Sequence, residues 1–217
     1  MKVLIACEKS GIVRNAFLDQ EHDAWSCDLE PSEDLTNRHI QDDIRYVLQQ
    51  ESWDLLMVAH PPCTRLCNSG VRWLTKAPNG KTLDEMYEEL ELGSRFFADM
   101  WNADVPKIAV ENPVMHGKAK ERIKKYSNNY FPDKPSQTVQ PWHFANDPDG
   151  LDNVKKRTCF WLKDLPPLFN TGTLDGSSAR ADIHNEAPSP QRAINRSRFF
   201  PGLANAMASQ WGQLIGV

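Results

Sequence analysis

The chain has 217 residues, of which 40% are apolar, and this is enough for one α/β unit with a sizeable core. No stretch approaches the roughly 18 apolar residues that a membrane span needs, and five scattered cysteines argue against a disulfide framework. The net charge of −4 conceals a division: residues 1–113 carry 11 basic and 20 acidic side chains, whereas residues 114–163 carry 10 and 5. The basic middle segment can face phosphate, although a solvated basic helix over 118–125 explains it equally well.

Segments typical of strands and of helices alternate along the chain. The apolar N-terminus is too short for a signal peptide and predicts a first buried strand. Because the sequence shows no targeting signal, we expect a cytoplasmic protein. Leu55 to Val58 form a continuous apolar run, as expected of a central parallel strand. Thr82 and Glu85 form a capping box, which begins a helix whose apolar stripe reaches Trp101. We predict strands at 2–6, 24–28, 53–59, 107–110 and 158–162, helices at 12–17, 44–50, 82–101 and 203–214, and loops at 64–80 and 170–200.

Alternating strands and helices predict a mostly parallel sheet with helices on both faces. Ligands bind such sheets beyond the C-terminal ends of the strands. Four of the predicted ends carry polar or reactive side chains, at Glu8 to Gly11, Asp28, Pro62-Cys63 and Glu111-Asn112. We therefore expect these residues to converge on one edge of the sheet.

Cys63 follows two prolines at a strand end, where the stiffened turn can aim the thiol outward. A cysteine thiolate is a soft nucleophile suited to an electron-poor ring carbon, although most free cysteines are buried and inert. Glu111, at the end of another strand, can protonate a ring nitrogen while the sulfur attacks a carbon of the same ring. Alternatively, Glu111-Asn112-Pro113 forms a helix-capping turn. Together the two motifs favour the catalytic interpretation.

The same motifs carry a family resemblance. Pro61-Pro62-Cys63 resembles the Pro-Cys nucleophile motif of DNA cytosine-5 methyltransferases, and Val110-Glu111-Asn112-Pro113 resembles their Glu-Asn-Val motif, in the same order along the chain. The similarity covers nearly the whole chain and is greatest to compact phage-type members. Three further matches concern the cofactor: residues 6–11 are similar to the family's cofactor loop, Asp28 to its ribose-binding acid, and residues 42–44 to its adenine-binding segment. Residues 155–158 are similar to the basic motif that contacts the target nucleotide, and residues 198–207 to the closing segment.

The resemblance implies a Rossmann-like S-adenosylmethionine-dependent methyltransferase fold, with residues 1–217 as a single catalytic domain. It implies methyl transfer from S-adenosylmethionine to C5 of cytosine in DNA, with Cys63 bonded to C6 and Glu111 protonating N3. A cytosine within a duplex must first be flipped out of the helix. The implied residues are Cys63, Glu111 and Arg157 for catalysis, Glu8, Ser10, Gly11, Asp28, Asp43, Pro61 and Asn205 for the cofactor, and Pro62, Arg72, Asn112 and Lys156 for the substrate, with no metal.

Three departures from the family pattern bear on this assignment. The cofactor loop has only Gly11 where the family usually carries more glycine and an aromatic residue, and Lys155-Lys156-Arg157 replaces a spaced-arginine pattern. The interval from Lys163 to Arg192, about 30 residues, is too short for a separate target-recognition domain with a core of its own. Recognition of a target sequence would then be lax, or come from 64–80 and 114–150, or need a specificity partner protein. Arg192, Arg196 and Arg198 suit phosphate contact and a solvated face equally well.

Two other functions stay open. A C5-pyrimidine methyltransferase acting on a free nucleotide or RNA is consistent with the missing recognition domain and the overall acidity. A non-catalytic protein of the same fold that binds nucleic acid or cofactor is consistent with the altered cofactor loop.

Overall fold

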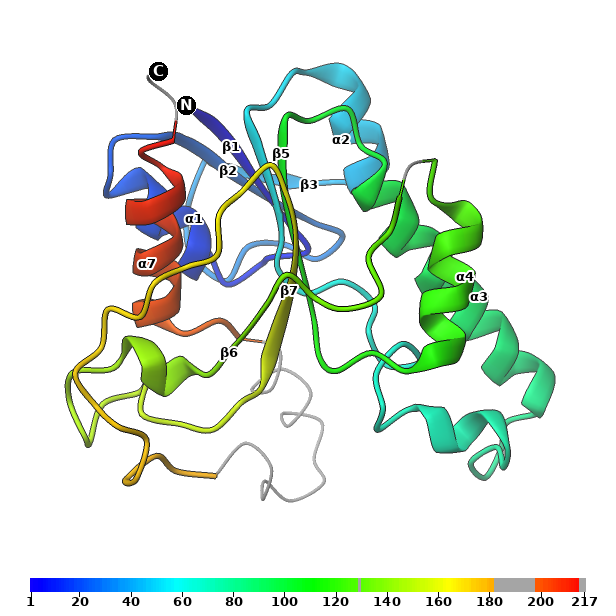
Figure 1. Ribbon diagram of the computed structural model, residues 1–217. Helices are drawn as coiled ribbons and strands as arrows, with labels where there is room; N and C mark the ends of the chain where they lie inside the picture. Colours follow the sequence, from blue (N-terminus) through cyan, green and yellow to red (C-terminus); the bar gives the residue numbers. More distant parts are fainter. Residues whose placement is uncertain (129, 182–197, 215–217) are drawn as a thin grey trace.

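The computed structural model describes residues 1–128, 130–181 and 198–214. Within these residues one sheet runs through the centre of the molecule, in the order β3-β2-β1-β4-β5-β7-β6 (Figure 1). The strands are β1 (Lys2–Ala6), β2 (Asp23–Asp28), β3 (His39–Gln41), β4 (Leu55–Val58), β5 (Lys107–Asn112), β6 (Gln137–Val139) and β7 (Thr158–Lys163). The first five strands are parallel to one another, whereas β7 runs antiparallel to both β5 and β6.

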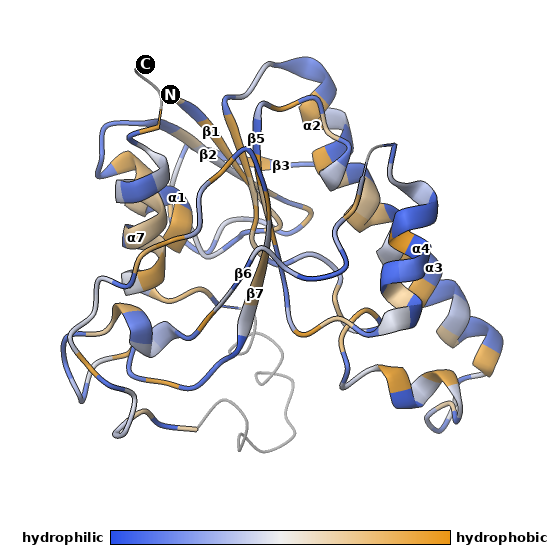
Figure 2. Cartoon of the chain, in the orientation of Figure 1, coloured by the Kyte–Doolittle hydropathy of each residue, from blue (hydrophilic) through white to orange (hydrophobic). Residues whose placement is uncertain are grey.

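Helices cover both faces of the sheet, and each face has its own apolar core. On one face α1 (Ile12–Leu18) packs beside α7 (Pro201–Trp211), and on the other lie α2 (Ile44–Gln50), α3 (Leu83–Trp101) and α4 (Gly117–Tyr126). Two short 3-10 helices, η1 (Val71–Leu74) and η2 (Pro141–Phe144), lie in the connections. In Figure 2 the central strands are largely hydrophobic and α4 is largely hydrophilic, as a buried sheet under an amphipathic helix requires.

The predicted architecture, a mostly parallel sheet with helices on both faces, is confirmed by this strand order and these strand directions. The predicted Thr82–Glu85 capping box is present at the start of α3, and the basic helix expected at 118–125 is α4. Within the described residues no helix combines the length and apolar character needed to span a bilayer.

The structure differs from the prediction at several elements. The strands β3 and β6 were not predicted, because each has three residues and no apolar run. The last helix was predicted at 203–214 but begins at Pro201, since proline fits the first helical turn, and it ends at Trp211. Part of the predicted loop 64–80 forms η1, and the predicted loop 170–200 extends into residues 182–197, outside the described residues.

Candidate active site

The C-terminal ends of the parallel strands β2, β1, β4 and β5 lie side by side at one edge of the sheet. The residues at or just after these ends are Asp28, Cys7-Glu8, the His60–Cys63 turn, and Glu111-Asn112. The predicted convergence of the strand-end motifs is therefore present. Such an edge is where ligands bind in open α/β sheets.

The turn after β1 is built around the buried carboxylate of Glu8. Its Oε1 accepts the backbone N–H of Val13 at 2.7 Å, and its Oε2 accepts that of Arg14 at 3.1 Å, so it caps α1. Ser10 Oγ donates to the same carboxylate at 3.3 Å. Burial raises the Glu8 pKa to about 6, against the hydrogen bonds that favour its charged form. The carboxylate of Glu8 thus faces the start of α1 and lines neither of the cavities at this edge that are described below.

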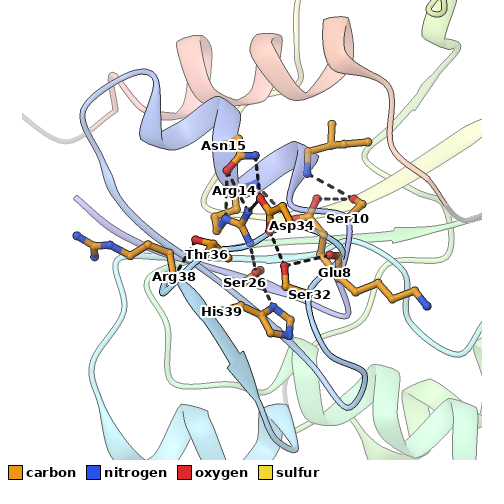
Figure 3. A network of polar contacts seen from close by, with 12 residues as sticks. Glu8, Ser10, Arg14, Asn15, Ser26, Ser32, Asp34, Thr36, Arg38 and His39 are labelled. Carbon is orange, nitrogen blue, oxygen red and sulfur yellow. Dashed lines mark hydrogen bonds and ion pairs between the residues drawn. The ribbon is translucent and has the colours of Figure 1, made fainter.

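Arg14 is fully buried and fastens the segment after β2 to α1, as Figure 3 shows. Its Nη1 donates to Ser26 Oγ at 2.8 Å, and its Nη2 donates to the carboxylate of Asp34. Gly11 has a φ of 73°, and a Cβ at this position would lie 2.2 Å from Arg14 Nη2. Gly11 is therefore required for the turn and for the position of Arg14, and it contacts no cavity at this edge.

A cavity of about 560 Å³, here the Asp28 cavity, lies between this edge of the sheet, α2 and α3. Its volume is typical of small-molecule sites. Asp28 accepts the backbone N–H of Glu30 at 3.0 Å and is only half-buried, so its carboxylate can accept further hydrogen bonds. The Asp28 cavity is lined by Cys7, Cys27, Asp28, Leu29, Asp42, Asp43, Ile44, Arg45, His60, Pro62, Thr64, Arg65, Glu89, Leu92, Gly93 and Phe96.

Asp43 is the N-cap of α2, where its carboxylate accepts the backbone N–H of Arg45 at 2.9 Å and also binds the Arg45 side chain. The Arg45 hydrogen bonds hold the pKa of Asp43 below its usual range. Of the two aspartates expected to bind cofactor, Asp28 is therefore the one whose carboxylate makes fewer hydrogen bonds.

A smaller cavity of about 210 Å³, here the Ser10 cavity, adjoins the Asp28 cavity and shares Cys7, Asp28 and His60 with it. Its other lining residues are Lys9, Ser10, Glu30, Glu33 and Arg198. Both signs of charge are present, which suits a ligand part that carries an ammonium and a carboxylate.

His60 stands where the two cavities meet. Its Nε2 is buried and has no hydrogen-bond partner among the described residues. Burial, with the charge of Lys156 added, holds the His60 pKa well below its usual value, so the ring is neutral. The ring packs on Phe199 with 5.1 Å between centroids. An unpartnered imidazole nitrogen at this junction is a group that a ligand in the two cavities would satisfy.

Cys63 begins a tight turn after Pro61 and Pro62, in which its carbonyl accepts the N–H of Leu66 at 2.9 Å and of Cys67 at 3.1 Å. The thiol is half-buried. Burial raises the pKa of Cys63 to about 12, and the neighbouring charge of Glu111 adds to the rise. The sulfur is therefore protonated at neutral pH and must lose its proton before it attacks.

Glu111 lies in β5 with 5% of its surface exposed. Burial raises the Glu111 pKa to about 7, and the charge of Lys156 opposes that rise. Its carboxyl can therefore both accept and donate a proton near neutral pH. The adjacent Asn112 is fully buried; its Nδ2 donates to the carbonyl of Pro113 at 2.6 Å, and its Oδ1 has no partner among the described residues.

Lys156 and Arg157 are neighbours in sequence but line different spaces. Lys156 borders a small gap with Glu111 and Phe199, and its Nζ donates to the carbonyl of Arg198 at 3.1 Å. Arg157 lines a separate cavity of about 560 Å³ beside β7, here the Arg157 cavity. The structure thus brings Cys63, Glu111 and Lys156 together and places Arg157 in another cavity.

Of the remaining predicted residues in the described part of the chain, only Pro62 and Arg198 border the cavities at this edge. Arg72 is exposed in η1 with its guanidinium over the ring of Trp73, and Asn205 is exposed on α7. Pro61 is buried, whereas Pro62 borders the Asp28 cavity. Arg198 forms an ion pair with Glu33 at 2.6 Å, and the other two candidates for phosphate contact, Arg192 and Arg196, lie outside the described residues.

Sequence reasoning assigned no role to His60 or Phe96, which both line the cavities at this edge, and it included Lys9 only as part of the cofactor loop 6–11. The position of His60 directly before Pro61 could have suggested it. Phe96 follows Leu92 by four residues, on the face of α3 beside the core stripe. That spacing could have suggested that the two side chains line a cavity together.

No protein-family model and no curated protein matches this sequence. Among solved structures, the chain is similar to a candidate DNA modification methyltransferase encoded within a prophage of E. coli, with 12% sequence identity and a TM-score of 0.45. The similarity covers 75% of this chain and 46% of that protein, so this chain spans less than half the length of the protein it resembles.

Proposed function

We propose that this protein transfers a methyl group from S-adenosylmethionine to C5 of cytosine in DNA through a covalent Cys63 adduct, as a DNA (cytosine-5-)-methyltransferase. The observation that carries the proposal is that the Glu111 carboxyl, whose pKa of about 7 suits proton transfer, lies near enough to Cys63 for its charge to raise the pKa of the thiol.

The two adjoining cavities fit the cofactor. Asp28 would accept the ribose hydroxyls, and the apolar surface of Ile44, Leu92 and Phe96 would cover the adenine. Lys9 and the acids of the Ser10 cavity would hold the carboxylate and the ammonium, with His60 at the junction. S-adenosylmethionine would supply an electrophilic methyl group. Asp43 would contribute its carboxylate and, as the N-cap, would also hold the start of α2 in place beside the cofactor. Glu8 and Gly11 would contribute by shaping the turn that carries Ser10.

The proton inventory of the site supports a relay. With Glu111 ionised and Cys63 protonated, the carboxylate takes the thiol proton as the sulfur bonds to C6 of the cytosine. The same proton then passes from Glu111 to N3, which leaves the C5 carbon electron-rich and Glu111 ionised again. After methyl transfer, the C5 proton leaves to solvent, the C6–S bond breaks and N3 returns its proton. No net proton is stored on the protein.

Lys156, placed beside Glu111, would hold the base or its phosphate and stabilise the ionised carboxylate. Asn112 would orient the turn after β5, and Pro62 would limit the space between cofactor and base. Arg72 lies on the loop that follows Cys63, where it would cover a cytosine flipped out of the duplex.

A covalent trapping assay tests this function. Fluorine at C5 blocks the last elimination, so wild-type protein incubated with S-adenosylmethionine and DNA containing 5-fluorocytosine should give a shifted band on a denaturing gel. Cys63→Ala should abolish the band, whereas Cys67→Ala, which removes the buried thiol four residues later, should keep it. A band that survives Cys63→Ala would exclude the proposed nucleophile.

Parallel reactions with RNA and with the free nucleotide identify the acceptor. A trapped adduct only with RNA or the free nucleotide would contradict DNA as substrate. No adduct with any acceptor, together with no calorimetric binding of S-adenosylmethionine, would contradict methyl transfer and leave a non-catalytic binding protein.

A further inference from the structure

The Arg157 cavity is not used by the proposed methyl transfer. It lies between the loop after β5, the first turn of α4, residues 133–135, the segment from β6 to η2, and β7. Its volume of about 560 Å³ is that of a small-molecule site. The lining residues are Val114, Met115, Lys120, Asp133, Lys134, Pro135, Thr138, Gln140, His143, Arg157, Cys159 and Trp161.

Positive charge dominates this cavity. Lys120, Lys134 and Arg157 line it, and among the described lining residues Asp133 is the only acid. The Asp133 carboxylate is already paired with Lys124 at 2.5 Å. Within the described residues, Lys134 and Arg157 make no hydrogen bond or ion pair. Two cations without such partners at one cavity suit a phosphate group.

Two residues that line this cavity, Trp161 and Gln140, each carry a buried polar atom whose hydrogen-bonding capacity is unused, and a ligand reaches these atoms only when the side chains that cover them move. Trp161 is 1% exposed, and its Nε1–H has no acceptor among the described residues; the Oε1 of Gln140 has no donor. The Trp161 ring is held by Phe97 and Phe131, with centroids 5.6 Å and 6.2 Å away, so its indole N–H has a set position. Leaving buried polar groups unpaired is costly, and a ligand that offers one acceptor and one donor would satisfy both. The edge of a nucleobase offers this pair.

The cavity also borders the turn that carries Cys63. Met115 forms a backbone bridge with Cys67, and the N–H of Asn68 donates to the carbonyl of Val114 at 2.8 Å. A strand that places a base at Cys63 would therefore pass close to the Arg157 cavity.

We propose that the Arg157 cavity binds the nucleotide that neighbours the reacting cytosine in the substrate strand, an inference that rests on the proposed function for the identity of that strand. Lys134 and Arg157 bind its phosphate, and Trp161 and Gln140 bind its base edge. The cavity thereby reads one flanking base in a chain whose interval 163–192 is too short for a separate recognition domain.

Nuclear magnetic resonance of the indole N–H groups tests the site directly. The protein contains seven tryptophans, and Trp161→Phe identifies the Trp161 resonance in protein labelled with nitrogen-15 tryptophan. On titration with the four deoxynucleoside monophosphates, the Trp161 resonance should move, and the matching nucleosides should bind at least about tenfold more weakly because they lack the phosphate. The Lys134→Ala/Arg157→Ala variant should lose this response, and Lys118→Ala/Lys125→Ala, which removes two exposed lysines of α4 outside the cavity, should keep it.

A Trp161 resonance that no nucleotide moves, or that moves equally in the Lys134→Ala/Arg157→Ala variant, overturns the site. Dinucleotides that contain cytosine should bind about tenfold more tightly than the mononucleotides, because they occupy two adjacent sites; equal affinity would overturn the assignment to a substrate strand. The titration needs neither cofactor nor the Cys63 thiol. If nucleotides shift the Trp161 resonance but no covalent adduct is trapped, the result would therefore contradict methyl transfer alone. If an adduct is trapped but the Trp161 resonance does not shift, the result would contradict this inference alone.

Discussion

Lys156 lies beside Glu111 in a small gap that Phe199 also lines, and its ammonium opposes the burial that raises the Glu111 pKa, which stands at about 7. Without that charge the carboxyl would stay protonated to higher pH, and it could not take the proton of the Cys63 thiol at neutral pH. The position of one lysine therefore decides at which pH the proposed relay operates.

Removal of that charge gives the first prediction. Methyl transfer needs ionised Glu111 and protonated Cys63, so its rate should rise as the pH passes through about 7. In Lys156→Met the Glu111 pKa rises, so the rising limb of the pH–rate profile should move to higher pH. Single-turnover rates from about pH 6 to about pH 9 measure the shift, and Lys155→Met, at an exposed neighbour, should leave the limb in place. An unmoved limb in Lys156→Met would exclude Glu111 as the titrating group.

Glu111→Gln should abolish adduct formation and also change how stability depends on pH. Because the folded-state pKa of Glu111 is raised from 4.5 to about 7, its contribution to stability is fully present below about pH 4.5 and is lost as the pH rises through about 7. Relative to wild type, the variant should therefore gain on the order of 3 kcal/mol between those limits. Urea denaturation at about pH 4.5 and pH 8 measures this gain, and a pH-independent difference would contradict the assigned pKa. Glu121→Gln, at an exposed position of α4, should show no such gain.

Asp28→Asn should weaken binding of S-adenosylmethionine by about tenfold to a hundredfold, since charged hydrogen bonds to two hydroxyls are replaced by neutral ones. The amide oxygen can still accept the N–H of Glu30, so the turn should keep its shape. Calorimetric titration gives the dissociation constant. Asp19→Asn, at an exposed acid after α1, serves as the matched control, and equal affinities in the two variants would exclude Asp28 as a cofactor ligand.

Two glycines with the same left-handed backbone give a matched pair. Gly11 and Gly80 have φ values of 73° and 80°, so alanine at either site costs about 1 kcal/mol in backbone strain. At Gly80 a Cβ meets nothing within 4 Å, whereas at Gly11 it would lie 2.2 Å from the buried guanidinium of Arg14.

Gly11→Ala should therefore lower the free energy of unfolding by several kcal/mol more than Gly80→Ala, because the Arg14 hydrogen bonds to Ser26 and Asp34 must shift. It should also weaken cofactor binding, since those bonds fasten the segment that follows Asp28. Urea denaturation and calorimetry measure the two effects, and equal destabilisation by the two substitutions would show that the Arg14 network is not rigid.

The sequence by itself determined the segments that form five of the seven strands described, and which strand ends carry polar or reactive side chains. The run from Leu55 to Val58 and the Thr82–Glu85 capping box are local patterns that need no distant contact. Because parallel strands align their C-terminal ends, the convergence of Asp28, Cys63 and Glu111 also followed from chain order alone.

Only the tertiary structure decided what each of these side chains faces. The pKa values of Cys63 and Glu111 depend on burial by segments far away in sequence, and Glu8 caps α1 because the turn folds back on it. Lys156 rather than Arg157 lies at Glu111 because side chains alternate in direction along an extended chain, and the antiparallel register of β7 against β5 sets which of the two reaches the site. That register depends on contacts between residues about 50 positions apart, which no local pattern encodes.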